Sequence, residues 1–232
     1  MKVEIWSDIV CPWCYIGKRR VEAALAAFPH RDSVEVVWRS FELDPYAPRA
    51  HDGDPADRLA AKYGMSRHDA ITAQHAMAAV AADEGLDFHL TTARSGSSFD
   101  AHRLVHLAAQ EGRQDHMKER LFAAYLVDEQ PIGDPGTLLD LAEEVGVDRE
   151  RAEAVLAGDA YGDAVRADEA EAMEFGISAV PYFVIDRTFG VSGAQPVETL
   201  EAALNQAWEK SQLIVLPSGE AGGACNGDNC VV

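Results

Sequence analysis

The sequence predicts an α/β protein in which a large helical insertion interrupts a small sheet. Residues 2–39 follow a strand–helix–strand pattern, and residues 52–176 are rich in alanine and carry repeated helix start and stop signals. Two short strand patterns and a final helix come afterwards, so the order is βαβ, helical insertion, ββα. We expect residues 1–45 and 177–212 to form one domain around the inserted helical domain of residues 46–176.

The first unit places a cysteine at the edge of the predicted sheet. Residues 2–7 alternate between two faces, as in a strand, and residues 34–39 are rich in β-branched and aromatic side chains. Residues 14–28 between them repeat apolar side chains at helical spacing. This arrangement is a right-handed βαβ unit with Cys11 at the carboxyl end of its first strand, where α/β sheets bind ligands.

The middle of the chain carries the signals that begin and end helices. Ser66, Asp148 and the pair Asp134–Pro135 are expected helix starts. Glycines stand where helices should end, at Gly64, Gly85, Gly112, Gly146 and Gly176. We find no internal repeat, so this part is a helical insertion and not a second α/β unit.

The last part of the chain returns to strands and then to one helix. Residues 182–185 and 188–191 are strand patterns joined by a turn around Asp186 and Arg187. The helix of residues 197–210 should face the sheet with Leu200, Leu204 and Trp208. Residues 213–232 are rich in glycine, and we expect a flexible C-terminal tail that carries Cys225 and Cys230.

The net charge and the first residues of the sequence argue against some classes of function and location. The chain has 20 Lys and Arg against 39 Asp and Glu, a formal charge of -19, which argues against general binding of nucleic acid or anionic membranes. The first residues run directly into a charged strand, and no segment has the length of a membrane span. We therefore expect a cytoplasmic protein, in which paired cysteines indicate redox catalysis or metal binding.

Cys11-Pro12-Trp13-Cys14 is the strongest functional motif. A cysteine at a helix N-terminus is activated as a thiolate, and a second cysteine one turn later can resolve a mixed disulfide. Pro12 suits the first helical turn, and Trp13 should offer an apolar contact near the site. Two buried core cysteines, or zinc ligands, are the alternatives. Structural zinc needs four ligands, and no second pair at typical zinc-site spacing accompanies this motif.

Val180 and Pro181 precede the third predicted strand. A cis peptide bond here would leave the backbone of Val180 free to pair with an extended substrate. An ordinary proline at the edge of a strand is the alternative.

Five segments together resemble one known family. In order they are SDIVCPWCYIGKRR, WRSFELDP, FDAHRL, GISAVPYFVID and GVSGAQP, and they are similar to the DsbA-like thioredoxin-fold oxidoreductases, in the FrnE-like branch. The resemblance spans residues 3–210. It implies a thioredoxin fold with an inserted helical domain, Cys11 as nucleophile, Cys14 as resolving thiol and a cis Pro181. It also implies a second cysteine pair near the C-terminus, which Cys225 and Cys230 match.

The resemblance leaves other functions open. The sister branch of 2-hydroxychromene-2-carboxylate isomerases uses glutathione, but those enzymes typically carry serine where Cys11 stands. They often have an asparagine before the helix with the His-Arg pair, where this chain reads Gly96-Ser97-Ser98-Phe99. A glutathione-dependent isomerase or transferase of small aromatic compounds is the second hypothesis. A thioredoxin-fold module that binds client chains without catalysis is the third.

The remaining cysteines and histidines give weaker signals. The turn sequence between Cys225 and Cys230 would allow a disulfide, and we expect this pair to exchange electrons with Cys11 and Cys14 or to shield them; incidental thiols in a disordered tail are the alternative. His102 and His106 lie four residues apart on a helix, but without a third ligand we expect surface or capping histidines.

We therefore expect a monomeric or homodimeric enzyme with protein or small-thiol disulfide substrates. It should have no bound cofactor and no metal, with glutathione as a candidate thiol partner.

Overall fold

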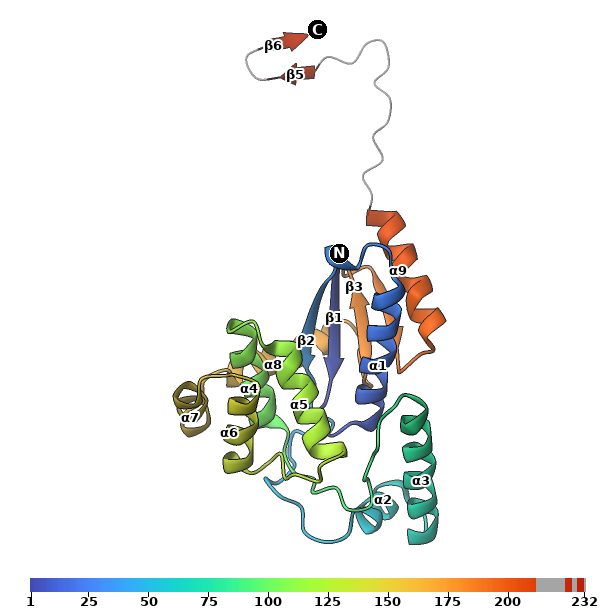
Figure 1. Cartoon of the computed structure of the whole chain (residues 1–232), viewed down its shortest axis with the longest axis vertical. Coiled ribbons are helices and arrows are strands. Elements are labelled where there is room, and N and C mark those ends of the chain that lie inside the picture. Colours follow the sequence, from blue (N-terminus) through green and yellow to red (C-terminus); the bar gives the residue numbers. More distant parts are fainter. Residues whose placement is uncertain (212–223, 227–228, 232) are drawn as a thin grey trace.

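A four-stranded mixed sheet forms the centre of the computed structural model, which describes residues 1–211 and the backbone of residues 224–226 and 229–231 (Figure 1). The strand order is β2-β1-β3-β4. Strand β1 (Lys2–Ser7) runs parallel to β2 (Glu35–Ser40) and antiparallel to β3 (Tyr182–Ile185). Strand β4 (Phe189–Ser192) completes the sheet beside β3. The predicted βαβ unit and the later hairpin are confirmed.

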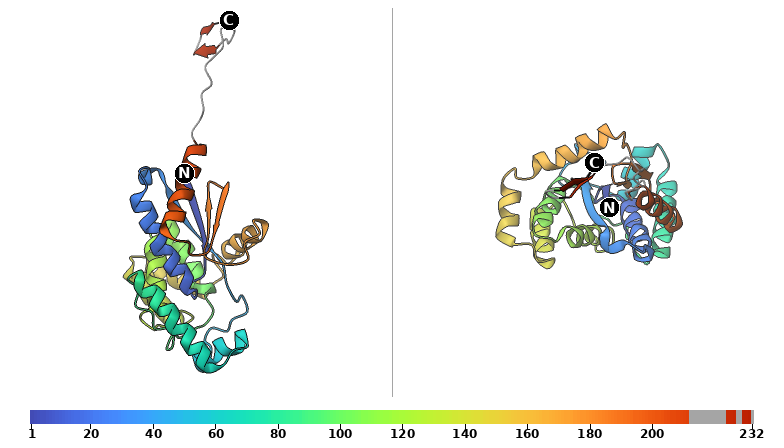
Figure 2. Two further views of the ribbon diagram at one scale, coloured as in Figure 1. Left: turned by 90° about the vertical axis from the view of Figure 1, so that its right-hand side faces the viewer. Right: turned by 90° about the horizontal axis from the view of Figure 1, so that it is seen from above.

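Helices cover both faces of the sheet. Helix α1 (Pro12–Ala27) and helix α9 (Val197–Ser211) lie side by side on one face, while α8 (Gly162–Glu174) covers the other (Figure 2). A short 3₁₀ helix, Arg31–Ser33, leads from α1 into β2. The alternation in β1 explains this layering, because Val3 and Ile5 join the core on the α1 side and Trp6 packs toward α8.

Seven helices of the described chain stand between β2 and β3. They are α2 (Pro55–Tyr63), α3 (Arg67–Asp83), α4 (Phe99–Gln110), α5 (Gln114–Leu126), α6 (Pro135–Glu144), α7 (Arg149–Ala157) and α8. The predicted caps are confirmed, since the side chains of Ser66, Asp134 and Asp148 each accept a backbone N–H in the first turn. The predicted helical character of this part is therefore correct.

The sheet and the inserted helices share one core. A single cluster of buried apolar side chains runs from Val3 and Ile5 in β1 to Leu104 in α4 and Leu138 in α6. The N-terminal end of α1, which carries the cysteine motif, lies where β1 meets these helices. The domain boundaries at residues 46 and 176 stay a prediction.

The end of the described chain agrees with the predicted elements. Asp186 and Arg187 have positive φ angles of 46° and 53°, as a tight turn between β3 and β4 requires. Leu200 and Leu204 are buried, and Trp208 stacks on His30 at a ring distance of 4.2 Å. In the described residues no helix is both long and apolar enough to cross a bilayer.

Two short strands near the C-terminus pair with each other. They are β5 (Ala224–Asn226) and β6 (Asn229–Val231), with Cys225 opposite Cys230 in the backbone register. The side chains of these cysteines lie outside the described residues, and so do the predicted disulfide, the electron relay and the flexible tail of residues 213–232.

Candidate active site

Cys11 occupies the position that begins helix α1. A turn follows β1, in which the Cys11 N–H donates to the Asp8 carbonyl oxygen at 3.2 Å. Cys11 keeps an extended backbone, with φ of -93° and ψ of 113°, and Pro12 is the first helical residue. The helix N-terminus favours a negative charge at this point, because its first N–H groups have no partners within the helix.

The segment before β3 brings Val180 and Pro181 to the thiol. The Val180–Pro181 peptide bond is cis, so the expected cis proline is present. The Cys11 thiol lies 3.7 Å from the Val180 carbonyl oxygen, to which it can donate. These two groups stand 169 residues apart in the sequence, and the pairing of β1 with β3 brings their segments together.

Exposure differs along the cysteine motif. Trp13 is 40% exposed, Cys11 is 5% exposed and Cys14 is fully buried. Burial raises the pKa of Cys14 well above its ordinary value, and the neighbouring Cys11 raises it further. The positive charge of Lys118 acts in the opposite direction. Cys11 is therefore the more exposed of two buried thiols, and Cys14 has no exposed surface.

Lys118 on α5 is a buried cation near both thiols that the sequence analysis missed. It is fully buried, and its ammonium donates to the Ser7 carbonyl oxygen at 3.3 Å. Within the described residues it has no carboxylate at ion-pair distance, and it lies over the rings of Trp38 and Phe122. Burial lowers the pKa of Lys118 to about 8, although the charges of Cys14 and Asp8 oppose the shift.

Asp8, in the turn that leads to Cys11, forms a buried pair with His102 of α4. Both side chains are 1% exposed, and His102 Nε2 lies 3.4 Å from Asp8 Oδ1. Asp8 also accepts the Leu43 N–H at 2.7 Å. Burial opposes ionisation of Asp8, but His102 and the Leu43 N–H lower its pKa overall. Burial and the charge of Lys118 lower the pKa of His102.

The prediction of surface or capping histidines is wrong for His102, because α4 turns this face into the core. His106, one turn further on, lies 3.2 Å from Asp168 and 3.1 Å from the Ser40 hydroxyl. The two histidines therefore contact different carboxylates. Among the described residues, no group of three or more metal-binding side chains could hold an ion.

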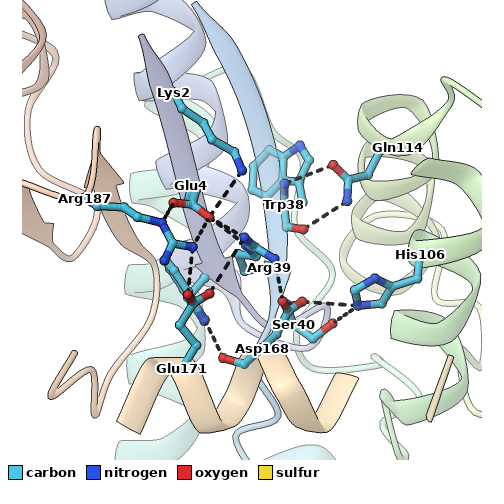
Figure 3. Close-up of polar contacts among 11 residues, drawn as sticks. Lys2, Glu4, Trp38, Arg39, Ser40, His106, Gln114, Asp168, Glu171 and Arg187 are labelled. Atoms are coloured by element: carbon cyan, nitrogen blue, oxygen red, sulfur yellow. Dashed lines mark hydrogen bonds and ion pairs between the residues drawn. The ribbon is translucent and has the colours of Figure 1, made fainter. Parts of the chain in front are cut away.

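An ionic network on the α8 side of the sheet supports the site (Figure 3). Arg39 on β2 contacts the buried Glu4 of β1 and lies 2.9 Å from Asp168 of α8. Arg187, from the turn after β3, reaches Glu4 at 3.1 Å and Glu171 at 2.7 Å. The network thus connects strands β1 and β2 and the turn after β3 with the last inserted helix, α8.

Comparison with known proteins identifies the family. The model of the DSBA-like thioredoxin domain matches residues 2–205. The chain belongs to the DsbA-like thioredoxin family. This match confirms the resemblance inferred from the sequence motifs, and the enzyme class is thiol–disulfide oxidoreductase.

The DsbA-like chain has relatives of nearly equal length. A probable DsbA oxidoreductase from Streptomyces coelicolor, known from a crystal structure, is 48% identical with a TM-score of 0.89, and the match covers 100% of this chain and 99% of that one. The uncharacterized protein YwbO of Bacillus subtilis is 29% identical over 211 residues, which are 90% of this chain and 98% of the relative.

More distant structures share the DsbA-like fold. The cytosolic disulfide reductase DsbM of Pseudomonas aeruginosa is 19% identical with a TM-score of 0.60, covering 91% of this chain and all of that one. A 2-hydroxychromene-2-carboxylate isomerase is 14% identical with a TM-score of 0.63, covering 90% and 97%. At these identities the likeness concerns the fold, which therefore serves both redox and isomerase chemistry.

Proposed function

We propose that this DsbA-like protein exchanges disulfides through Cys11 as the nucleophile and Cys14 as the resolving thiol. The observation that carries the proposal is the position of Cys11, at the start of α1 and 3.7 Å from the carbonyl before Pro181. Of the two sulfurs, that of Cys11 is the more exposed and the nearer to the proposed substrate contacts. The sulfur of Cys14 lies one turn away and is fully buried. It is therefore better placed to attack a mixed disulfide at Cys11 than to react with thiols from solution.

The exchange proceeds in two balanced steps. In the reducing direction, the Cys11 thiolate attacks one sulfur of a substrate disulfide, the substrate S–S bond breaks and one substrate thiolate leaves. Cys14 then loses its proton and attacks the Cys11 sulfur, which releases the second substrate thiolate and leaves a Cys11–Cys14 disulfide. The oxidising direction is the reverse, with a substrate thiolate attacking Cys11 in the oxidised enzyme.

Val180, Pro181, Pro12 and Trp13 are the proposed substrate contacts. In the described structure neither the N–H nor the carbonyl of Val180 has a backbone hydrogen-bond partner. The N–H can therefore pair with an extended substrate, as in the addition of a strand, and the carbonyl oxygen, which accepts from the Cys11 thiol, has a second lone pair for the same substrate. The exposed Trp13 ring beside Cys11 provides an apolar contact for the same segment.

The direction of exchange depends on the reduction potential of the Cys11–Cys14 pair against that of its partners. We propose disulfide-bearing proteins or small thiols as substrates, glutathione as a candidate partner and the cytoplasm as the location. The similarity to DsbM of Pseudomonas aeruginosa, a cytosolic disulfide reductase, supports this location. Equilibration with defined glutathione buffers, read by alkylation of free thiols, measures the potential.

Cys14→Ser tests the assignment. In an insulin-reduction assay this variant should lose turnover and accumulate a mixed disulfide at Cys11, which mass spectrometry detects. The double variant Cys225→Ser and Cys230→Ser is the control for the tail thiols. Full activity of Cys14→Ser toward a small aromatic substrate with glutathione would favour the isomerase hypothesis instead. Absence of thiol exchange in the wild-type protein would favour the binding module.

A further inference from the structure

Asp8 holds the turn between β1 and the cysteine motif with both its backbone and its side chain. Its carbonyl oxygen accepts the Cys11 N–H at 3.2 Å, and its Oδ1 lies 3.4 Å from the Val10 nitrogen. Its Oδ2 accepts the Leu43 N–H at 2.7 Å, which ties the turn to the loop after β2. Because Asp8 is fully buried, the contacts of its carboxylate determine where the backbone of the turn lies.

Helix α4 of the insertion supplies the side-chain partners of this carboxylate. His102 Nε2 lies 3.4 Å from Asp8 Oδ1, and in residues 1–211 it has no hydrogen bond to any other group. Ser98, four residues earlier at the start of α4, also forms a hydrogen bond with Asp8. Buried polar atoms are nearly always paired, so the Asp8 carboxylate is the group that accounts for a buried histidine at this position.

His102 is a neutral donor in this pair. Burial and the positive charge of Lys118 lower the pKa of His102, and His106 adds to the shift. Asp8 opposes it. A neutral imidazole carries one N–H, and the tautomer with this proton on Nε2 can donate to the Asp8 carboxylate. A donor on α4 therefore fixes the carboxylate that holds the turn.

One peptide group lies between Lys118 and the buried sulfur of Cys14. Its oxygen, the Ser7 carbonyl, accepts from the Lys118 ammonium at 3.3 Å. Its N–H belongs to Asp8 and forms a hydrogen bond to the Cys14 sulfur. Burial and Cys11 raise the pKa of Cys14, whereas this N–H and the charge of Lys118 lower it. A cation at the oxygen of a peptide polarises its N–H, so the two interactions strengthen each other at the sulfur.

We propose that His102 is a positioning residue for Cys14, because it holds Asp8 where the Asp8 N–H stabilises the Cys14 thiolate. The inference rests on the proposed function and concerns its second step, in which Cys14 attacks the Cys11 sulfur. The bonds that form and break are those given above. The inserted helices thus contribute to the exchange, although both thiols lie outside them.

The test separates the two steps of the exchange. Reduced enzyme is mixed in stopped flow with one equivalent of dithiodipyridine, a neutral disulfide that releases a coloured thiopyridone at each step. The first release reports attack by Cys11, and the second reports resolution by Cys14. All proteins carry Cys225→Ser and Cys230→Ser, so that only the two thiols of the motif react.

His102→Leu should slow the second release about tenfold at pH 7 and move the midpoint of its pH profile to higher pH. The first release should keep its wild-type rate. His102→Gln should restore the second release, because its side-chain amide places an N–H near the position of Nε2 and can donate to Asp8. A role of His102 in stability alone would leave the pH profile of the second release unchanged.

His106→Leu is the matched control. His106 lies one turn further along the same helix, and its Nε2 is 3.2 Å from Asp168 (Figure 3). This variant removes a buried contact of α4 without touching Asp8, so both releases and the pH profile of the second should stay as in wild type. An equal shift of the profile in His106→Leu would overturn the role given to His102.

A measurement on the reduced protein with an intact His102 covers the case in which His102→Leu does not fold. The amide proton of Asp8 should shift in NMR spectra as Cys14 ionises, and Cys14→Ser should abolish this titration. The imidazole of His102 should stay neutral with its proton on Nε2. An Asp8 amide that does not respond to Cys14, or a proton on Nδ1 alone, would overturn the inference.

Failure of this inference and failure of the proposed function give different results. A normal second release with an unchanged pH profile in His102→Leu would overturn the positioning role and leave the thiol exchange supported. Absence of the second release in the protein with His102 intact would overturn the proposed function itself, because Cys14 would then not resolve the mixed disulfide.

Discussion

The pKa of Lys118 shows how strongly burial can change the charge state of one side chain. A buried ammonium without a carboxylate is costly, and the shift of its pKa from 10.5 to about 8 corresponds to roughly 3 kcal/mol of lost stability at neutral pH. In exchange, its charge acts against the raised pKa of Cys14. Lys118 thus favours the thiolate of Cys14, which resolves a mixed disulfide, and lowers the stability of the folded protein.

Lys118→Met should separate these two effects. Because the folded pKa is below the unfolded one, the cost is full below pH 8 and disappears as the pH rises to 10.5. The variant should therefore be at least as stable as wild type at pH 7. Wild type should gain stability between pH 8 and pH 10.5, and the variant should not, as measured by urea unfolding. Its release of mixed disulfides should slow by about tenfold, because the pKa of Cys14 rises further.

Lys18→Met is the matched control for Lys118. Lys18 is also buried, but it contacts Glu22 and lies 3.3 Å from Asp115 and 3.1 Å from Glu119. Its loss removes three ion pairs, although Arg19 still pairs with Glu22 and Glu119. The variant should therefore be less stable than wild type without a change in the release of mixed disulfides. Equal kinetic effects of the two variants would contradict the role given to Lys118.

At the scale of elements, helix α1 touches the loop before β3 at a glycine. A Cβ atom on Gly17 would lie 2.8 Å from Pro181 Cγ and 3.4 Å from the Phe183 ring. The missing side chain is what allows the helix that carries both thiols to lie against Pro181. The contact between Cys11 and Val180 depends on this close approach.

Gly17→Ala should move the two elements apart. Overpacking of this kind costs about 1–3 kcal/mol, and the displaced loop should slow thiol exchange more than the loss of stability explains. Stopped-flow oxidation, at a temperature where the variant is fully folded, measures the rate. Gly162→Ala in α8 is the control, since its Cβ would lie at an ordinary 3.5 Å from Phe99. An unchanged exchange rate in Gly17→Ala would refute this role.

At the scale of the whole molecule, the network around Arg39 joins the sheet to the inserted helices. Burial opposes ionisation of Glu4 and Asp168, but hydrogen bonds from their partners lower the pKa of both carboxyl groups. Stability from such groups is present above their unfolded pKa values and is lost as the pH falls through the folded ones. The contact between α8 and the sheet should therefore weaken in acid.

Arg39→Met should destabilise the protein by about 3–5 kcal/mol, because it leaves two buried carboxylates without their shared cation. It should also move the acid unfolding midpoint upward, as circular dichroism records. Arg187→Met removes an arginine from the same Glu4, but this side chain is 51% exposed, so the loss should be below about 1 kcal/mol. Similar losses of stability in the two variants would contradict the argument that the burial of the arginine determines how much its removal destabilises the protein.

Local patterns predict much of this molecule. The alternation in residues 2–7, the helix caps and the order of the elements all depend on neighbouring residues, and the structure has them. The cysteine motif and Pro181 could be found because their residue types and positions are specific. Even so, their contact comes from the pairing of β1 with β3.

The rest of the site required the tertiary structure. Asp8, His102 and Lys118 come from different elements, and nothing in their local sequence distinguishes a buried charge from an exposed one. Lys118 is followed directly by Glu119 and Arg120, although Leu121 and Phe122, three and four residues on, share its face of α5. Such a mixed pattern fits both a buried and an exposed lysine, and a similar ambiguity explains the wrong prediction for His102.

The 169 residues that separate Cys11 from Val180 also affect biosynthesis. A ribosome adds about 5–20 residues per second, so the thiols leave it roughly 8–34 s before the loop that completes their site. During this interval the nascent chain carries two cysteines without their partners. A reducing environment at the ribosome then protects the growing polypeptide from cross-linking before it has become an enzyme.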